Sequence, residues 1–299
     1  PMDPIAPSLA RLQQVQVRYR DHTALHGIDL QVRAGQVLAL LGRNGAGKST
    51  AISVLLGLRR AAAGQVELLG GDPQQRDHRL GLGVMLQSTS LPPMLQVDEL
   101  VAQASACYPD PLPLGDVLQR VGLQDLARRR YGQLSGGQQR CVQFAIAICG
   151  RPRVLFLDEP TTGLDIQARQ AMWQAIRQLV AEGCGVLLTT HYLEEAEALA
   201  QRVVVLEQGR VVADAPLSEL RLADRPRRIR CRSTLATDEV QHWPGVQQVQ
   251  RDGEHLQVLA SPAEPVVARL LAADAQLREL EVQGAALADA FLDLTREAA

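Results

Sequence analysis

The chain has 299 residues, 46% hydrophobic and 21% charged, a composition ordinary for a globular protein and a length that allows one large and one small domain. Its formal net charge of −2 excludes a chain-wide basic surface for nucleic acid or for an anionic membrane. No apolar run reaches the roughly 18 residues of a transmembrane helix. The five cysteines show no metal-ligand spacing, so we expect reduced thiols.

The first part of the chain predicts strands by two patterns. Residues 12–19 and 27–32 alternate apolar and polar side chains, as half-exposed strands do. Residues 35–42 form a compact apolar run, as a buried strand does, and lead through glycines into a helix predicted over 48–59. The next predicted strands cover 64–70 and 81–87.

Residues 91–133 lose this alternation, contain several prolines and show only short helical patterns, so we expect a helical insert there. The alternation of strands and helices then resumes. The predicted elements are strands over 153–158, 185–190 and 202–212 and helices over 165–183 and 194–200. Apolar strands that alternate with helices predict an α/β fold with a mainly parallel sheet, covered by helices on both faces.

The pattern changes again after a break at 214–227. The predicted elements beyond it are strands over 228–233, 246–251, 255–260 and 277–283 and helices over 236–242, 264–273 and 284–297. The order β-α-β-β-α-β resembles a small ferredoxin-like α+β domain. We therefore expect one domain over 9–220, with a helical subdomain at about 88–150, and an accessory domain over 227–299. The basic cluster 221–232 is interpreted as a solvated linker, with a lipid-binding patch as the alternative.

Residues Gly42 to Ser49 follow the pattern G-x4-G-K-[ST] between a predicted buried strand and a helix. Glycines let the backbone curl so that its N–H groups face a phosphate at the positive end of the helix. Lys48 is the only lysine among the 31 Lys and Arg residues of the chain. A slim ammonium can reach around such a loop, whereas the planar guanidinium of arginine needs more space. We interpret the segment as a phosphate-binding loop; the alternative, an accidental glycine-rich turn, is expected in about one chain in a hundred of this length.

A second pair of glycines, Gly136 and Gly137, follows Ser135 and precedes an apolar helix. Such a helix start favours an anion, although the phosphate loop already supplies one site of this kind. Further along, an apolar strand ends in two carboxylates, Asp158 and Glu159. With these residues in this order, the chain resembles the nucleotide-binding subunit of an ATP-binding cassette (ABC) transporter.

The resemblance covers roughly residues 9–212 and rests on several motifs in register. They are the Walker A loop 42–50, the Q-loop residue Gln87, the signature LSGGQ at 134–138, the Walker B strand 154–158 followed by Glu159, the D-loop GLD at 163–165, the switch residue His191 and the aromatic Tyr19. Each residue alone has a simpler structural interpretation, and only the ordered set favours the family. The resemblance implies a P-loop NTPase fold of ABC type, with antiparallel N-terminal strands and a helical insert beside the parallel sheet.

The resemblance also implies ATP and Mg²⁺ as cofactors and a role for each residue that binds them. The phosphates would be bound by Gly42, Asn44, Gly45, Ala46, Gly47, Lys48, Ser49 and Thr50, and the adenine ring would stack on Tyr19. Ser49 and Gln87 would ligate Mg²⁺ directly, and Asp158 would hold it through water.

Three residues would be catalytic: Glu159 as general base, His191 at the γ-phosphate, and Lys48. A head-to-tail homodimer with two competent sites is implied, in which the signature of one copy closes over the nucleotide of the other. The residues that would act across this interface are Leu134, Ser135, Gly136, Gly137 and Gln138, with Asp165 in the D-loop.

The sequence departs from the family at three positions outside the phosphate site. Cys141 and Ile146 stand where relatives often carry arginine, and Ile166 stands where proline often follows the D-loop aspartate. These departures put dimer stability or partner contacts in doubt rather than hydrolysis.

Segments 189–213 and 287–295 resemble the ATPase subunits of bacterial drug-resistance exporters of the daunorubicin type. This branch implies a subunit at the cytoplasmic face of the inner membrane that energises a separate polytopic permease. The permease would contact the helical subdomain near 91–95 and 108–114, and no nucleic acid is expected as a partner. One alternative is a soluble ABC ATPase acting on ribosomes or DNA, although such proteins usually carry two cassettes. A non-catalytic regulatory binder is disfavoured because Lys48, Glu159 and His191 are all present.

Overall fold

The structure is a computed structural model that describes residues 7–20, 22–220 and 227–283. Its internal contacts divide the chain into two compact units, residues 1–215 and 216–299. Each unit has a hydrophobic core of its own. The division falls within the break at 214–227, and the domain bounds 9–220 and 227–299 stay a prediction.

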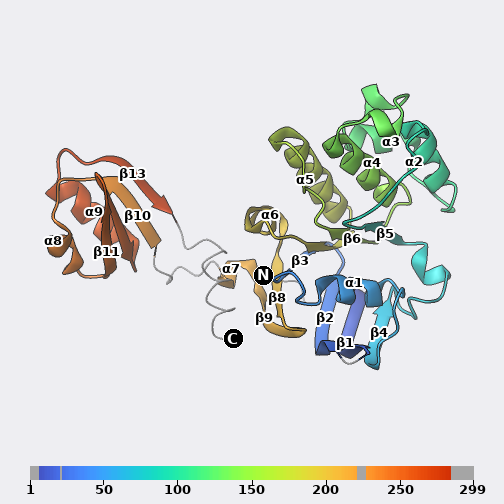
Figure 1. The fold of residues 1–299 in the computed structure, drawn as a ribbon, viewed down its shortest axis with the longest axis horizontal. Coiled ribbons are helices and arrows are strands. Elements are labelled where there is room, and N and C mark those ends of the chain that lie inside the picture. Colours follow the sequence, from blue (N-terminus) through green and yellow to red (C-terminus); the bar gives the residue numbers. More distant parts are fainter. Residues whose placement is uncertain (1–6, 21, 221–226, 284–299) are drawn as a thin grey trace. The chain divides into compact units, whose positions relative to one another are not determined.

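A six-stranded sheet with the order β5-β6-β7-β3-β8-β9 forms the centre of the first unit (Figure 1). Its strands are β3 (Val37–Leu41), β5 (Leu82–Met85), β6 (Val154–Asp158), β7 (Gly185–Thr189), β8 (Arg202–Glu207) and β9 (Arg210–Pro216). β3 pairs in parallel with β7 and β8, and β6 pairs in parallel with β5 and β7. Every residue of β3, β6 and β7 is buried, which explains their continuous apolar runs. The predicted mainly parallel sheet is confirmed.

A three-stranded antiparallel sheet with the order β2-β1-β4 adjoins it. Its strands are β1 (Ser8–Tyr19), β2 (His22–Arg33) and β4 (Ala63–Leu68). The sequence pattern missed the start of β1 because Leu9 and Ala10 are both buried beside a shift in register with β2, which breaks the alternation.

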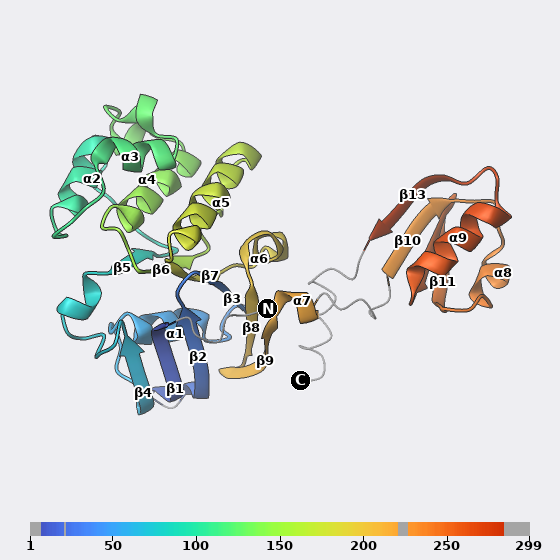
Figure 2. The same cartoon turned by 180° about the vertical axis from the view of Figure 1, so that it is seen from behind.

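The helices of the first unit lie on both sides of the six-stranded sheet. They are α1 (Lys48–Leu55), α2 (Val97–Ser105), α3 (Leu114–Arg120), α4 (Gly136–Ile148), α5 (Ile166–Ala181) and α6 (Leu193–Leu199). Figures 1 and 2 show α2 to α5 grouped on one side of the sheet, with α1 and the three antiparallel strands on the other. Among the described residues, no helix is long and apolar enough to cross a membrane.

The β8–β9 segment and helix α1 also differ from the predicted elements. Residues 202–212, predicted as one strand, form the β8–β9 hairpin, because Gln208 and Gly209 take the left-handed values of φ that a tight turn requires. The helix predicted over 48–59 ends at Leu55. Gly57 follows it with a φ of 67°, and a Cβ at this position would lie 2.6 Å from the carbonyl oxygen of Pro73.

The second unit has the predicted β-α-β-β-α-β order. Its elements are β10 (Arg227–Arg232), α8 (Thr237–Gln241), β11 (Val246–Asp252), β12 (His255–Ala260), α9 (Ala263–Ala273) and β13 (Arg278–Gln283), after a single helical turn, α7 (Leu217–Leu220). The antiparallel sheet has the order β11-β12-β10-β13. Part of the predicted basic linker is therefore a central strand, β10. The predicted helix 284–297 and the segment 287–295 lie outside the described residues.

Candidate functional site

The phosphate loop joins the end of buried strand β3 to the start of α1. Gly47 precedes the helix with a φ of 107°, and no side chain caps the helix N-terminus. The first N–H groups of a helix have no acceptor within the helix, so this end of α1 keeps free donors and a positive dipole. An anion is the natural partner of such an end.

Two glycines of the loop leave no room for a side chain. A Cβ at Gly42 would lie 2.3 Å from the carbonyl oxygen of Leu206, and one at Gly47 would lie 2.8 Å from Cδ2 of Leu25. A Cβ at Gly45 would meet nothing within 4 Å, because its surroundings are open. The loop is therefore packed against β8 and β2 on one side and open on the other, where a phosphate can approach.

Lys48 places its ammonium inside this loop. Its Nζ donates to the carbonyl oxygens of Gly42 (2.7 Å) and Arg43 (3.1 Å). Burial lowers the pKa of Lys48, while the nearby carboxylates of Glu159 and Asp158 partly counteract this effect. Its hydrogen bonds are all to the loop's own backbone, so an incoming phosphate can replace these acceptors.

Glu159 stands between two of the other predicted site residues. Its Oε2 accepts a hydrogen bond from Nε2 of Gln87 (2.9 Å), and its Oε1 lies 3.1 Å from Nδ1 of His191. Its backbone has a φ of 49°, and its N–H donates to the carbonyl oxygen of Thr189 (3.0 Å). The ends of three neighbouring strands, β5, β6 and β7, thus bring together side chains that are far apart in sequence.

Asp158, the last residue of β6, is 8% exposed and accepts a hydrogen bond from Oγ1 of Thr189. The sequence did not predict Thr189, whose role depends on the pairing of β6 with β7. Ser49, at the start of α1, is exposed. Hydroxyl, amide and carboxylate oxygens are the donors that Mg²⁺ prefers, and this ion usually keeps several waters and phosphate oxygens as well. The residues therefore fit a magnesium ion that is bound together with a nucleotide.

Tyr19 is 38% exposed at the end of β1. The guanidinium carbon of Arg59 lies 3.9 Å from the centre of the Tyr19 ring. The Tyr19 hydroxyl lies 3.4 Å from Oγ1 of Thr50. Arg59 covers one face of the ring, so an adenine could stack only on the other. The sequence offered no signal for Arg59, which lies far from Tyr19 along the chain.

The signature residues open α4. Oγ of Ser135 accepts from the N–H of Gln138 (3.2 Å), and Oε1 of Gln138 accepts from the N–H of Ser135 (3.0 Å), which is a capping box. A Cβ at Gly136 would meet nothing within 4 Å, so this residue faces open space. In the D-loop, Asp165 caps α5 by accepting from the N–H of Ala168 (2.8 Å). Across the described residues, no hydrogen bond or ion pair joins the signature to the phosphate loop of the same chain.

Arg140, which the sequence did not single out, lies on α4 beside the predicted catalytic residues. Its guanidinium donates to the carbonyl oxygens of Gln87 (3.3 Å) and Glu159 (2.6 Å). Its sequence neighbours gave no sign of these contacts, because they depend on how α4 packs against the ends of two strands.

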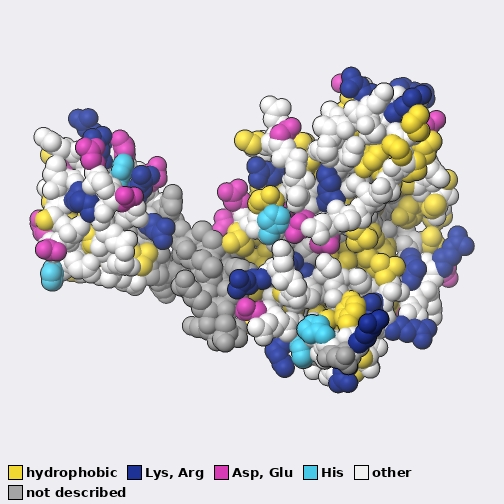
Figure 3. Space-filling view, in the orientation of Figure 1, with side chains coloured by type: hydrophobic (Ala, Val, Ile, Leu, Met, Phe, Trp, Pro, Cys, Tyr) yellow, Lys and Arg dark blue, Asp and Glu magenta, His cyan; other side chains and the backbone are white. Residues whose placement is uncertain are grey.

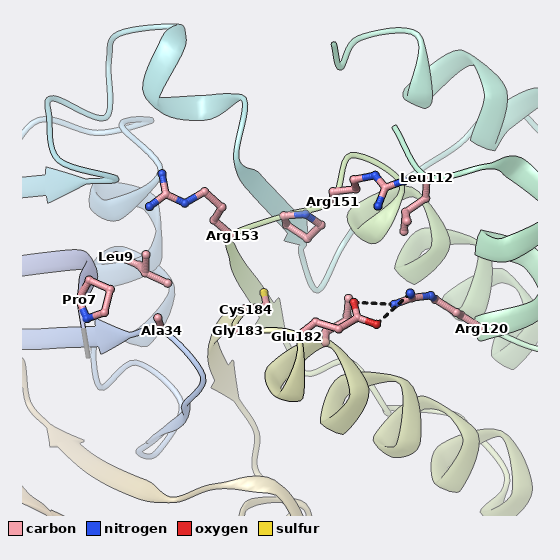
Figure 4. Close-up of a pocket in the computed structure, with 12 residues that line it drawn as sticks. Pro7, Leu9, Ala34, Leu112, Arg120, Arg151, Arg153, Glu182, Gly183 and Cys184 are labelled. Carbon is pink, nitrogen blue, oxygen red and sulfur yellow. Dashed lines mark hydrogen bonds and ion pairs between the residues drawn. The ribbon is translucent and has the colours of Figure 1, made fainter. Parts of the chain in front are cut away.

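A cavity of about 600 Å³ lies where β6 and β7 begin, at the ends of these strands opposite to Glu159 and His191. Its lining includes the ion pair between Arg120 of α3 and Glu182 (2.9 Å) and the buried side chain of Cys184 (Figure 4). None of the predicted site residues lines it. The candidate site therefore depends on backbone donors at the other edge of the sheet rather than on this cavity.

The profile of a family described as ABC transporter matches residues 25–162. The chain is 38% identical to the Nod factor export ATP-binding protein I of Burkholderia pseudomallei (strain 1710b), in an alignment that covers 95% of each chain. The chain belongs to the ABC transporter family. Within this family it is an ATP-binding subunit and an ATPase.

Further relatives of this ABC subunit agree with that placement. The daunorubicin resistance ATP-binding protein DrrA3 of Streptomyces coeruleorubidus is 39% identical over 73% of this chain and 71% of its own. A solved ATP-binding subunit of an ABC transporter matches with a TM-score of 0.66 at 27% identity, over 71% of this chain and 92% of that one. A dimeric bacterial ABC transporter cassette matches in fold, with a TM-score of 0.63 at 24% identity over 70% of this chain and 99% of that one.

Proposed function

We propose that the chain is the ATP-hydrolysing subunit of an ABC exporter and that it energises a separately encoded membrane permease. The observation that carries the proposal is the contact of Glu159 with both Gln87 and His191. A carboxylate held between two polar side chains beside a phosphate loop is suited to take a proton from water. The names of two relatives, a Nod factor export protein and a daunorubicin resistance protein, support export.

ATP supplies the phosphoanhydride bond that is broken, and Mg²⁺ neutralises the charge that develops on its phosphates. Lys48 and the backbone N–H groups at the start of α1 bind the phosphates in this proposal, and Tyr19 stacks on the adenine through its uncovered ring face. Ser49 and Gln87 hold the metal directly, and Asp158 holds it through water.

Glu159 accepts the proton of the attacking water, and its two neighbours orient it. Gln87 donates a hydrogen bond from its side-chain amide to Glu159, so the amide oxygen of Gln87 can bind the metal. His191 contacts Glu159 through Nδ1, which leaves Nε2 free to contact the γ-phosphate. Both partners are side chains that follow the ends of strands, and neither is a backbone group fixed by the fold, so each can exchange contacts when nucleotide binds.

A head-to-tail homodimer completes the site in this proposal. Ser135, Gly136 and Gly137 of one copy close over the nucleotide of the other, with Asp165 at the interface. The open surroundings of Gly136 and the lack of a contact between signature and phosphate loop within one described chain support this arrangement. The dimeric cassette of similar fold supports it as well.

The permease contacts the helical subdomain in this proposal, next to the Q-loop. Met94, at 65% exposed, is one of the most exposed large hydrophobic side chains described. Figure 3 shows hydrophobic side chains gathered over the part of the unit that holds α2. Tyr108, within the second segment predicted to meet the permease, instead packs so closely that a Cβ on Gly150 would lie 2.4 Å from its ring. This packing supports 91–95 over 108–114 as the proposed contact with the permease.

The subunit is proposed to lie at the cytoplasmic face of the inner membrane, where ATP is available and where a permease can hold it. No nucleic acid is proposed as a partner, because the net charge of −2 offers no basic surface across the chain.

Purification of the tagged protein from native membranes in mild detergent tests the proposal. We expect a polytopic membrane protein to co-purify and the complex to hydrolyse ATP. The variant Met94→Glu is expected to lose the membrane protein while the isolated subunit keeps its ATP binding. Leu271→Glu, at another exposed apolar position in the second unit (53% exposed), serves as the control. Recovery of ribosomal or DNA-repair proteins without a membrane protein would contradict the proposal.

A further inference from the structure

Arg140 occupies the second turn of α4, the helix that the signature opens. One of its terminal nitrogens, Nη1, donates to the carbonyl oxygens of Leu86 (3.1 Å) and Gln87 (3.3 Å). The other, Nη2, donates to the carbonyl oxygens of Asp158 (3.3 Å) and Glu159 (2.6 Å). One guanidinium therefore bridges the backbones at the ends of β5 and β6.

The contacts of Arg140 extend through Gln143, one turn further along α4. Nη1 of Arg140 also donates to Oε1 of Gln143 (2.8 Å). Nε2 of Gln143 in turn donates to the carbonyl oxygen of Thr89 (3.1 Å) and to the hydroxyl of Tyr131 (3.0 Å). Gln143 is 8% exposed, so this link is shielded from competing water. The segment after Gln87 is thereby held by the same face of the helix.

The chemistry of the cluster requires a guanidinium. The five acceptors of Arg140 are four backbone carbonyls and one amide, so no salt bridge accounts for its position. A planar fork can serve acceptors on two separate segments at once, whereas the three donors of a lysine ammonium radiate from a single atom. Burial lowers the pKa of Arg140, and the carboxylates of Asp158 and Glu159 oppose this effect.

The carbonyls that Arg140 binds belong to the residues whose side chains do the proposed chemistry. Gln87 is the proposed metal ligand, and Asp158 and Glu159 are the proposed water-mediated ligand and base. The same helix begins at Ser135, which is proposed to close over the nucleotide of the second copy. A movement of α4 at its N-terminus would therefore be passed to the backbone of Gln87 and Glu159.

We propose that Arg140 is a positioning residue that couples the signature of each chain to the Q-loop and the Walker B carboxylates of that same chain. Closure of a signature on one nucleotide thus sets the base and the metal ligand of the neighbouring site, and the two ATP sites act together. This inference rests on the proposed dimeric ATPase. It assigns to Arg140 the link between the two sites, a role that neither the phosphate loop nor Glu159 can supply.

The test compares Arg140→Met, which keeps the length of the stem and removes every donor, with Arg140→Lys, which keeps the charge. We expect Arg140→Met to lower kcat about a hundredfold, as a small misplacement of catalytic groups does, with KM for ATP changed less than about threefold. The Hill coefficient for ATP is expected to fall to one. Arg140→Lys is expected to regain only part of kcat.

The matched control is Arg177→Met. Arg177 also lies on a helix and donates to a backbone carbonyl, that of Ala198 (3.1 Å), but it has no contact with the site. We expect it to keep the wild-type kcat and Hill coefficient. If Arg140→Met is too unstable to assay, Arg140→Lys serves as the test instead. A lowered kcat and Hill coefficient in Arg140→Lys, at an unchanged Tm, would then support the proposal.

The inference would be overturned if Arg140→Met kept the wild-type kcat and Hill coefficient. The same holds for Arg140→Lys where Arg140→Met is too unstable to assay. Equal losses of Tm, ATP affinity and kcat in both variants would overturn it as well, because they would indicate a merely structural role. Failure of the proposed function gives a different result, since the wild-type protein itself would then show no cooperative hydrolysis.

Discussion

Asp274 in the second unit and Glu159 in the first are two carboxylates that differ in the hydrogen-bond donors around them. Asp274 of the second unit accepts from Oγ of Ser233 (2.7 Å) and from the backbone N–H groups of Thr234 (2.8 Å) and Gln276 (2.9 Å). These donors hold the pKa of Asp274 down to about 2, and burial opposes them only weakly. Backbone donors are part of the fold and cannot be exchanged. Asp274 is therefore a carboxylate that holds a structure together.

Glu159 of the first unit has its side chain held by two other side chains. Gln87 and His191 come from different strand ends, and the His191 side chain is 47% exposed. Side-chain partners can turn away when a ligand arrives, whereas the two backbone N–H groups that bind Asp274 cannot. A carboxylate that must accept and release a proton needs partners of the first kind. The difference supports the proposal that Glu159 serves chemistry and that Asp274 serves stability.

A large effect is expected at Lys48, whose ammonium is influenced by the nearby carboxylates of Glu159 and Asp158. Lys48→Met should lower ATP turnover about a hundredfold to a thousandfold, because a charge that stabilises the transferred phosphate is lost. Thermal stability should change little. Steady-state ATPase assays and a thermal melt of each variant measure this.

Lys48→Arg is the sharper variant at this position. It keeps the charge, but its planar fork has to fit between Gly42 and Gly47, where even a Cβ would be crowded. We expect turnover well below that of the wild type. Wild-type turnover in Lys48→Arg would contradict the explanation of why the chain has a single lysine.

Asp274→Asn is expected to lower stability and to leave ATP turnover unchanged, the reverse of what is expected for Lys48→Met. The amide loses acceptor strength toward Ser233 and Thr234 and places an N–H among donors, so the second unit should melt several degrees lower. ATP turnover should stay at the wild-type level. Calorimetry and ATPase assays read the two effects separately. A large loss of turnover with an unchanged melting temperature would remove the contrast between the two carboxylates.

Acid should affect the second unit through the same residue. The pKa of Asp274 is lowered from 3.8 to about 2 in the folded state, so its contribution to stability is complete above about pH 4. That contribution is lost as the pH falls from about 4 toward 2. The melting temperature of the second unit should fall over this window in the wild type, and less steeply in Asp274→Asn. Parallel slopes would contradict the assignment.

The smallest effect concerns the buried thiols, which report whether the interior of a unit opens. Burial raises the pKa of Cys141 to about 11 and that of Cys184 to about 12, whereas Cys107 is exposed. At neutral pH a thiol reagent should modify Cys107 first, as mass spectrometry can show. Cys231, buried in the second unit, should become reactive in Asp274→Asn before Cys141 does. Simultaneous labelling would contradict independent opening of the two units.

Much of the fold could be predicted because its patterns are local. The apolar runs of β3, β6 and β7 and the glycines before Lys48 lie within short stretches of sequence. The β8–β9 turn was missed because Gln208 takes a left-handed φ that its residue type does not announce. The start of β1 was missed because a shift in register interrupts the alternation.

The site divides in the same way. Lys48, Asp158 and Glu159 lie in contiguous motifs, whereas Thr189, Arg59 and Arg140 matter only through partners that the fold brings to them. Arg140 stands among many arginines, so its type carried no signal. Its importance depends on four carbonyl groups at the ends of two strands, which no local pattern places beside α4.

The central claim is that Glu159 is the base of an ATPase, and Glu159→Gln tests it most directly. Glutamine keeps the size of the side chain and can still contact Gln87 and His191, but it cannot take a proton. We predict that turnover of ATP falls about a hundredfold to ten-thousandfold while binding of ATP and the melting temperature stay near the wild-type values. Turnover close to that of the wild type would contradict the account, since the cluster around Glu159 would then hold a structural carboxylate like Asp274.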